Sequence, residues 1–453
     1  MNILFTISST VTAIALLAIA VMFAVSYRKN GSSFKTPLKC TLKREKAKGV
    51  VFGKNGPLFL FSPTTDEGHI FVGGGSGTGK TSALLIPTLR SWEGNAFVID
   101  ISGDISKNVE ACRKLVYDPL SATSVPYNIF ASIDELCEDS DRVEALAQLA
   151  LLIMPELQNS SANADFYQTG GRDILTAALI WGYHKKMDFI QICEAITEKS
   201  FSTLFNEIDK SKDTAAIRYI NQFEGTNEAN TAGCKQNADR AVALFAGTER
   251  VKRTIRRPVV GEESFSCQSV EDHSVFVLIP DARLELLAPL LHIITAQLLN
   301  YLADRSPENK TPILLALDEF VSLGKLEIAP ALRKLRKKHV RIMVLTQSMA
   351  DIDELYKKES RMAMMNNFAF KVILSAGDTD SQRYYADLIG QEDKKKVSIT
   401  SGSVWNGQGL TATKSTERGH IIEPAELANL GNELILLYPG GYKRLEKNYY
   451  FKQ

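Results

Sequence analysis

The sequence predicts an α/β fold with a parallel sheet, an inserted all-α domain and one N-terminal transmembrane helix. Apolar strand-like runs alternate with helical stretches in residues 49–132 and 258–453, which is the pattern of a parallel sheet covered by helices on both faces. Residues 133–257 instead show helical periodicity over a domain's length. We therefore expect one discontinuous α/β domain that is interrupted by a helical domain.

The first 27 residues predict an uncleaved membrane anchor. Residues 3–25 carry no charge and are long enough to cross a bilayer. Only Met1 and Asn2 precede this run, whereas a cleaved signal peptide begins with a basic segment. Residues 28–48 form a basic linker, with eight Lys or Arg residues against one acid. Because positive charge stays in the cytoplasm, we expect a single-pass protein whose bulk is cytoplasmic, and the linker also suits anionic lipid headgroups.

Composition excludes several classes of function. The chain has 453 residues, enough for two to three domains, and a net charge of +1. So small a charge gives no global field for nucleic acid, so any such surface must be local. The six cysteines form no C-x-x-C pair, and the six histidines are isolated. This excludes the common zinc spacings and suits a reducing compartment.

A glycine-rich loop, G-x-x-x-x-G-K-T, runs from Gly74 to Thr81, between the apolar run 69–72 and a helical run that starts at Ser82. Strand, glycine loop and helix are the context that a phosphate-binding loop requires, because backbone N–H groups and the helix N-terminus surround the phosphate. We expect Lys80 to reach the β- and γ-phosphates of ATP and Thr81 to bind Mg²⁺, with no other metal. The predicted nucleotide-binding residues are Gly74, Gly75, Ser76, Gly77, Thr78, Gly79, Lys80, Thr81 and Ser82.

The other elements follow from local patterns. Two short apolar runs, Val50–Phe52 and Leu58–Phe61, flank the turn residues 55–57 and predict a β-hairpin. Residues 398–418 are rich in Ser, Thr and Gly and predict a mobile loop. The remaining predicted strands are 96–100, 114–117, 274–279, 313–317, 340–345, 370–374 and 434–437.

Two adjacent acids follow the predicted strand 313–317. In proteins with a phosphate-binding loop, acids at this position bind Mg²⁺ and position the attacking water. Asp318 would bind the metal through water, and Glu319 would orient or deprotonate the attacking water. The next strand is followed by Gln347, whose amide would sense the γ-phosphate; alternatively, it only satisfies backbone groups. The sequence therefore predicts ATP hydrolysis, with Lys80 supplying positive charge.

A basic stretch, residues 333–341, lies between these two strands. On a helix, Ile328, Leu332 and Leu335 share one face, while Arg336 projects from another. On pattern alone, a solvated basic face is the better interpretation. The alternative hypothesis places one of these arginines in a neighbouring subunit's nucleotide site as an arginine finger.

Taken together, these features resemble the coupling-protein ATPases of type IV secretion and conjugation, the TraD/TrwB-like group. The resemblance preserves the order of motifs over nearly the whole chain. It rests on the anchor, Gly49–Gly53, the helical insertion, Tyr117-Asp118-Pro119, Tyr127-Asn128, Leu317–Leu326, Gln347-Ser348 and Glu423–Leu427.

The resemblance implies a RecA-like motor domain that works as a homo-hexameric ring at the bacterial inner membrane. Such a ring delivers DNA, expected to be single-stranded, or protein substrates to a secretion channel, with relaxosome and channel proteins as partners. Related proteins use an arginine before the Gln-bearing strand in trans. By position this resembles Arg336, with Arg333 and Arg341 as the alternatives.

The chain also departs from the family pattern. Many relatives have two membrane helices, and this sequence predicts one. Many have K-G-E after the strand aspartate, where this chain has residues 100–104, D-I-S-G-D, so the role of Asp104 stays open. No long tail follows Gln453, and we expect no substrate recruitment through one.

Three functions compete at this point. The favoured hypothesis is an ATP-driven translocation motor. The second is a membrane platform that binds ATP to dock substrates but turns over little. The third is a related pilus-assembly or DNA-segregation ATPase, against which the helical insertion and the single anchor argue. Glu319 and Arg336 favour the motor, and the substrate and partner channel stay open.

Overall fold

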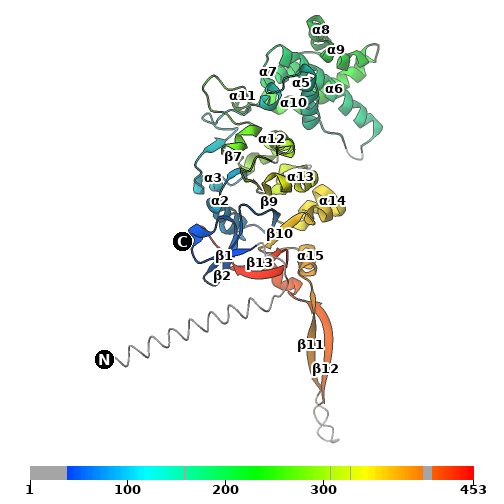
Figure 1. Ribbon diagram of the computed structural model, residues 1–453. Coiled ribbons are helices and arrows are strands. Elements are labelled where there is room, and N and C mark those ends of the chain that lie inside the picture. The colour runs from blue at the N-terminus through cyan, green and yellow to red at the C-terminus, as the bar shows by residue number, and fades with distance from the viewer. Residues whose placement is uncertain (1–37, 158–159, 307, 327, 401–410, 453) are drawn as a thin grey trace, which may run out of the picture.

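The computed structural model describes residues 38–157, 160–306, 308–326, 328–400 and 411–452. A twelve-stranded sheet runs through the α/β domain, and the helical insertion lies beyond one end of it (Figure 1). The predicted anchor and residues 28–37 of the basic linker lie outside the described residues. In sheet order, the strands are β1 (Lys39–Thr41), β3 (Leu58–Pro63), β2 (Gly49–Asn55), β14 (Gly441–Glu446), β13 (Glu433–Tyr438), β10 (Phe368–Ile373), β4 (His69–Gly73), β9 (Val340–Thr346), β8 (Ile313–Leu317), β5 (Asn95–Asp100), β7 (Ser274–Leu278) and β6 (Lys114–Tyr117).

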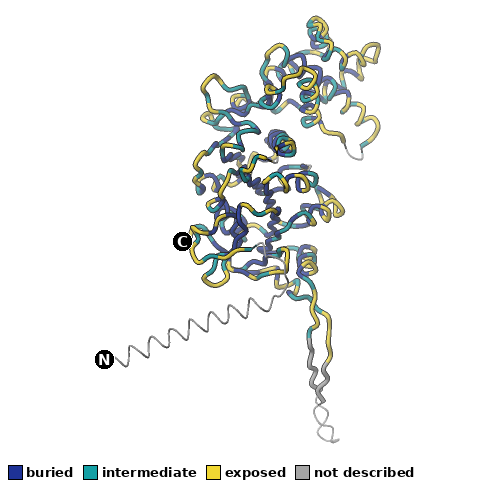
Figure 2. The backbone as a smooth tube through the Cα atoms, in the orientation of Figure 1, coloured by how far each residue is buried: buried dark blue, intermediate teal, exposed yellow. Residues whose placement is uncertain are grey.

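The seven neighbouring strands from β10 to β6 are parallel. Every residue of β4, β8 and β9 is buried, as expected for strands that are covered on both faces, and the buried backbone follows the sheet in Figure 2. The covering helices are α2 (Ile86–Ser91), α3 (Asp104–Asn108), α12 (Leu284–Asp304), α13 (Ile328–Lys334), α14 (Met349–Met365) and α15 (Thr379–Ile389).

One edge of the sheet differs from the prediction. The predicted hairpin β2–β3 is present, but it joins the main sheet together with β14 and β13 through antiparallel pairs. Strand β13, which the alternation of strands and helices places in the parallel set, is antiparallel to β10. β1 comes from the predicted linker and pairs with β3. The sheet is therefore mostly, not wholly, parallel.

The helical insertion is confirmed. Among the described residues between β6 and β7, its helices are α4 (Ala131–Asp134), α5 (Asp139–Ile153), α6 (Ala162–His184), α7 (Phe189–Glu198), α8 (Phe201–Ser211), α9 (Thr214–Ile220), α10 (Glu228–Gly247) and α11 (Glu249–Thr254). The chain enters and leaves the insertion at neighbouring points, because Tyr127 forms β-bridges with both Ile255 and Phe265. The domain limits at 133 and 257 stay predictions.

Close packing of α6 against α10 explains the small residues in α6. A Cβ atom added to Gly170 would lie 2.5 Å from Cys234 Sγ, and one added to Gly171 would lie 2.9 Å from the backbone oxygen of Cys234. Both distances are shorter than any real Cβ contact. The glycines therefore allow the two longest helices of the insertion to approach each other.

Within the described residues, Asp281–Asp304 is the one helical segment long and apolar enough to cross a membrane. Half of its most apolar 18-residue stretch is buried inside the protein. Helix α12, which forms most of this segment, contacts α5 and α10 of the insertion as well as α13. The segment is therefore a core helix that joins the two domains.

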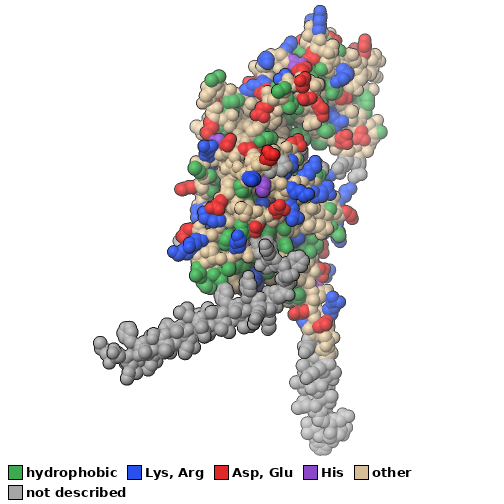
Figure 3. Space-filling model, in the orientation of Figure 1, with side chains coloured by type: hydrophobic (Ala, Val, Ile, Leu, Met, Phe, Trp, Pro, Cys, Tyr) green, Lys and Arg blue, Asp and Glu red, His purple; other side chains and the backbone are tan. Residues whose placement is uncertain are grey.

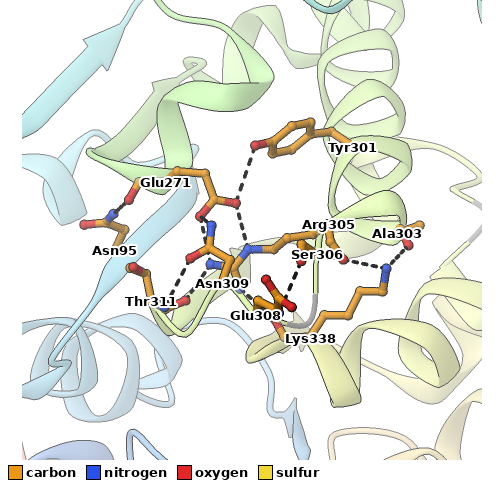
Figure 4. A network of polar contacts seen from close by, with 10 residues as sticks. All are labelled: Asn95, Glu271, Tyr301, Ala303, Arg305, Ser306, Glu308, Asn309, Thr311 and Lys338. Carbon is orange, nitrogen blue, oxygen red and sulfur yellow. Dashed lines mark hydrogen bonds and ion pairs between the residues drawn. The ribbon is translucent and has the colours of Figure 1, made fainter.

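A buried ion pair holds the C-terminal end of α12 (Figure 4). The guanidinium of Arg305 donates to Glu271 at 2.7 and 2.8 Å and to the carbonyl of Thr311 at 2.8 Å. Lys338 Nζ caps the helix by donating to the carbonyls of Ala303 and Arg305 at 2.6 and 2.7 Å. This network attaches the 3₁₀ helix η7 (Leu335–Lys338), which carries the candidate arginine finger, to the core.

The prediction of a loop at residues 398–418 is wrong for residues 398–400 and 411–418, which lie in strands, and residues 401–410 lie outside the described residues. Strands β11 (Gln391–Thr400) and β12 (Thr411–His420) pair over their full length and project from the body as an antiparallel hairpin (Figure 1). Ser and Thr suit turns, but β-branched Thr, Val and Ile also favour strands. The hairpin base is held by an ion pair from Lys394 to Glu423 at 2.5 Å and by a hydrogen bond between His420 and Asp387 at 2.9 Å.

Candidate nucleotide site

The predicted phosphate loop lies at the carboxyl ends of three adjacent strands, β10, β4 and β9. Gly74 N–H donates to the carbonyl of Thr346, at the end of β9, at 3.1 Å. Leu374 N–H, after β10, donates to the carbonyl of Gly73 at 2.8 Å. Gly77 and Gly79 have φ angles of 72° and 99°, in the left-handed region that favours glycine. Strand, loop and helix thus have the predicted arrangement.

Lys80 begins the helical turn η2 (Lys80–Leu85) that leads into α2. Its ammonium is nearly buried and donates to the carbonyls of Gly74 and Gly75 at 2.8 and 3.3 Å. It also lies 3.7 Å from Glu319 Oε1. The side chain therefore folds over the loop, where a phosphate would offer it anionic oxygens in place of carbonyls.

The two predicted metal-binding residues are neighbours. Thr81 Oγ1 lies 3.5 Å from Asp318 Oδ2, although 237 positions separate the two residues. Burial raises the pKa of the Asp318 carboxyl to about 6; the nearby charge of Glu319 adds to the increase, and Lys80 opposes it. A hydroxyl and a carboxylate are oxygen ligands of the kind that Mg²⁺ takes beside substrate phosphates, so this pair fits a magnesium ion.

Glu319 and Gln347 are also in contact. Gln347 Nε2 donates to Glu319 Oε2 at 3.1 Å. The bond goes to the predicted catalytic carboxylate, which favours the hypothesis of a γ-phosphate sensor over a purely structural amide. Glu319 has a φ angle of 47°, an unusual conformation for a residue other than glycine. Such local strain is common where a side chain must be directed into a site.

Arg336 lies apart from this cluster. Its side chain is 62% exposed, and its Nε donates to Glu67 at 3.1 Å. Glu67 precedes the N-terminal end of β4, whereas the phosphate loop follows the C-terminal end of β4. The structure therefore places Arg336 toward the opposite edge of the sheet from the loop of its own chain. Basic side chains gather on this surface near α13 (Figure 3).

The structure separates the three candidate arginines. The predicted apolar face, Ile328, Leu332 and Leu335, is buried, and Arg333 and Arg336 are exposed. Arg341 is 2% exposed and donates to the carbonyls of residues 63 and 68 at 3.1 and 2.8 Å. Burial lowers its pKa to about 10. Burial and these hydrogen bonds argue against Arg341 as the arginine finger.

Some supporting residues escape sequence analysis. Ser375 Oγ accepts from Gly75 N–H at 3.1 Å and supports the loop from beyond β10. Its position just after a parallel strand is the only signal that could have indicated it. Asp100 caps α3 by accepting from the N–H groups of Gly103 and Ser106, both at 2.8 Å. The exposed Asp104 begins α3, and its role stays open.

Residues 25–453 match the family described as "Type IV secretory system Conjugative DNA transfer". This chain belongs to that family of type IV secretion coupling proteins. It is 21% identical over 412 residues to the conjugal transfer protein TraG of Agrobacterium fabrum, covering 86% of this chain and 61% of TraG. Protein VirD4 of Rhizobium rhizogenes is 22% identical over 364 residues, covering 76% of this chain and 53% of VirD4. The coupling protein thus spans less than two thirds of the length of these relatives.

Solved structures of the plasmid coupling protein TrwB share the fold. Unbound TrwBdeltaN70 gives a TM-score of 0.68 at 21% identity and covers 93% of this chain and 96% of the other. TrwB with ADP and Mg²⁺ gives 0.67 at 20% identity, covering 93% and 98%. A further TrwB structure, with a TM-score of 0.68 at 21% identity, holds the ATP analogue ADPNP and covers 92% and 96%. The large, mostly parallel sheet with a helical insertion is therefore the fold of this family.

Asp318→Asn is expected to stabilise the nucleotide-free coupling protein at neutral pH. The pKa of Asp318 rises from 3.8 to about 6 on folding, so the unfolded chain ionises first as pH increases. The resulting loss of stability grows between about pH 4 and pH 6 to about 3 kcal/mol and then stays constant. Thermal unfolding of parent and variant should therefore differ least below about pH 4 and most above pH 6. Asp104→Asn, at an exposed acid, is the control, and a pH-independent difference would contradict the assignment.

Proposed function

We propose that this coupling protein is a membrane-anchored, hexameric, RecA-like ATPase. It couples ATP hydrolysis to the delivery of DNA, expected to be single-stranded, and/or protein substrates to a type IV secretion channel. The contact of Lys80 and Gln347 with Glu319, beside the Thr81–Asp318 pair, carries the proposal. It gathers the parts of a phosphoryl-transfer site at one sheet edge.

Each side chain has a defined task in this proposal. Lys80 balances charge on the β- and γ-phosphates, and Thr81 and Asp318 hold Mg²⁺, which supplies further charge neutralisation. Glu319 orients the attacking water and accepts its proton, while Gln347 fixes the carboxylate of Glu319. Arg336 stabilises the transition state in a neighbouring subunit, because it lies at the opposite edge of the sheet from its own loop.

The docking platform is the second candidate. It needs ATP binding but no water activation, so the Gln347–Glu319 contact favours the motor. An ATPase assay of residues 28–453, with and without single-stranded DNA, tests this choice. The fragment retains β1, which is part of the sheet. Stimulation by DNA supports the motor, whereas ATP binding without turnover under either condition supports the platform.

Deletion of residues 1–27 is expected to release a soluble, active ATPase that no longer supports transfer in cells. The predicted anchor precedes the basic linker, so the intact chain should span the bacterial inner membrane once, with its bulk in the cytoplasm. Membrane fractionation, ATPase assays and conjugation frequencies measure these effects. The anchor prediction would be wrong if the mature protein in cells began after residue 25.

A further inference from the structure

A segment far along the chain, residues 447–452, lies on the helix that follows the phosphate loop. Tyr450 N–H donates to the carbonyl of Ser82 at 3.0 Å. Lys447, itself buried, donates from Nζ to the carbonyl of Gly431 at 2.7 Å and holds the start of the segment. Figure 1 places this end of the chain beside α2. The segment is therefore fixed against the nucleotide site.

The ring of Tyr449 contacts the last glycine of the loop. A Cβ atom added to Gly79 would lie 3.2 Å from Cε1 and 3.5 Å from the hydroxyl of Tyr449. The ring centroid of Phe451 lies 5.3 Å from that of Tyr449, and Phe451 is 60% exposed. Lys452 Nζ lies 4.8 Å from the Tyr449 ring centroid. Tyr449 thus borders the loop, and the Phe451 ring and the Lys452 ammonium pack against Tyr449.

This location has a chemical consequence for a bound nucleotide. In the proposed site Lys80 and Thr81 would face the β- and γ-phosphates, so the α-phosphate and nucleoside would extend past the end of the loop, toward Ser82. The 447–452 segment is hydrogen-bonded at that residue. The exposed ring of Phe451 offers a flat face on which a nucleobase can stack.

We propose that Tyr449 and Phe451 form the nucleoside-binding wall of this site and stack against the base of a purine nucleoside triphosphate. Purines present the larger flat face. The inference rests on the proposed nucleotide-driven function and adds to it a source of affinity for the base that is separate from the phosphate contacts. No residue of the phosphate loop itself contributes an aromatic ring.

The test compares two probes on the full-length protein in detergent: ATP and inorganic tripolyphosphate, each with Mg²⁺. Tyr449→Ala combined with Phe451→Ala should weaken ATP binding about 10- to 100-fold, because base stacking is lost. Tripolyphosphate has no base, so its affinity should change less than about twofold. Tyr449→Phe keeps the ring and should bind ATP like the parent. Tyr442→Ala removes a ring from the exposed end of β14 and is the matched control.

Equal losses for both probes would overturn the inference, because the two rings would then only support the phosphate loop. Unchanged ATP affinity in the double variant would overturn it as well. Lys80→Ala should weaken both probes and shows that the assay reports the phosphate site. If the parent protein binds neither probe, the proposed function is itself contradicted. If the parent binds both, the result with the double variant tests the inference separately from the proposed function.

Discussion

Glu319→Gln should bind ATP normally but hydrolyse it about 10²- to 10⁴-fold more slowly, the usual contribution of a general base. The amide keeps the size of the side chain and can still accept from Gln347, which donates to the carboxylate at 3.1 Å. It cannot take a proton from water. The loss should therefore appear in kcat, with nucleotide affinity retained.

Lys80→Ala provides the complementary result. Its buried ammonium folds over the loop at Gly74 and Gly75, so its removal should lower nucleotide affinity as well as turnover. Steady-state ATPase rates and equilibrium nucleotide binding separate the two variants. Matched controls are Glu354→Gln in α14 and Lys107→Ala in α3, both at exposed positions. Hydrolysis at the parent rate by both Glu319→Gln and Lys80→Ala would show that the site is assigned incorrectly.

Arg336→Ala should reduce ATP hydrolysis by about 10³- to 10⁵-fold while monomers keep their affinity for ATP. In the monomer this guanidinium is exposed and pairs only with Glu67 among the contacts that the structure describes. An exposed ion pair contributes little stability, so the guanidinium can separate from Glu67. Its forked set of donors can then stabilise the charge on a neighbouring subunit's γ-phosphate. Helix η7, fixed by the buried Leu335 and by Lys338, provides the rigid support.

A mixing experiment tests the action in trans. Inactive Arg336→Ala and inactive Lys80→Ala subunits, assembled together, place an intact loop beside an intact arginine at some interfaces, so part of the activity should return. Lack of recovery in confirmed mixed rings is compatible with coordinated firing of all subunits and does not by itself reject the finger. Arg333→Ala, at the neighbouring exposed arginine, is the control. Normal hydrolysis by Arg336→Ala alone would reject the finger and make Arg333 the next candidate.

The sequence by itself was sufficient to predict the residues at the centre of the candidate site. The glycine loop and the acids at 318–319 are local motifs, and each directly follows an apolar strand. Since the carboxyl ends of parallel strands meet at one edge of a sheet, sequence order sufficed to predict that Thr81 lies near Asp318 and Glu319 near Gln347. The all-helical character of the insertion was equally readable from its periodicity.

The tertiary structure decided what depends on contacts between distant segments. Arg336 and Arg341 belong to one basic run, yet Arg336 is exposed and Arg341 is buried, because Arg341 has entered β9 beside the β3–β4 connection. Ser375 supports Gly75 across 300 positions of sequence, and Tyr449 reaches Gly79 from still further along the chain. Local patterns report which face of a helix or strand is apolar. Only the order of strands in the folded sheet determines which remote side chains meet at its edge.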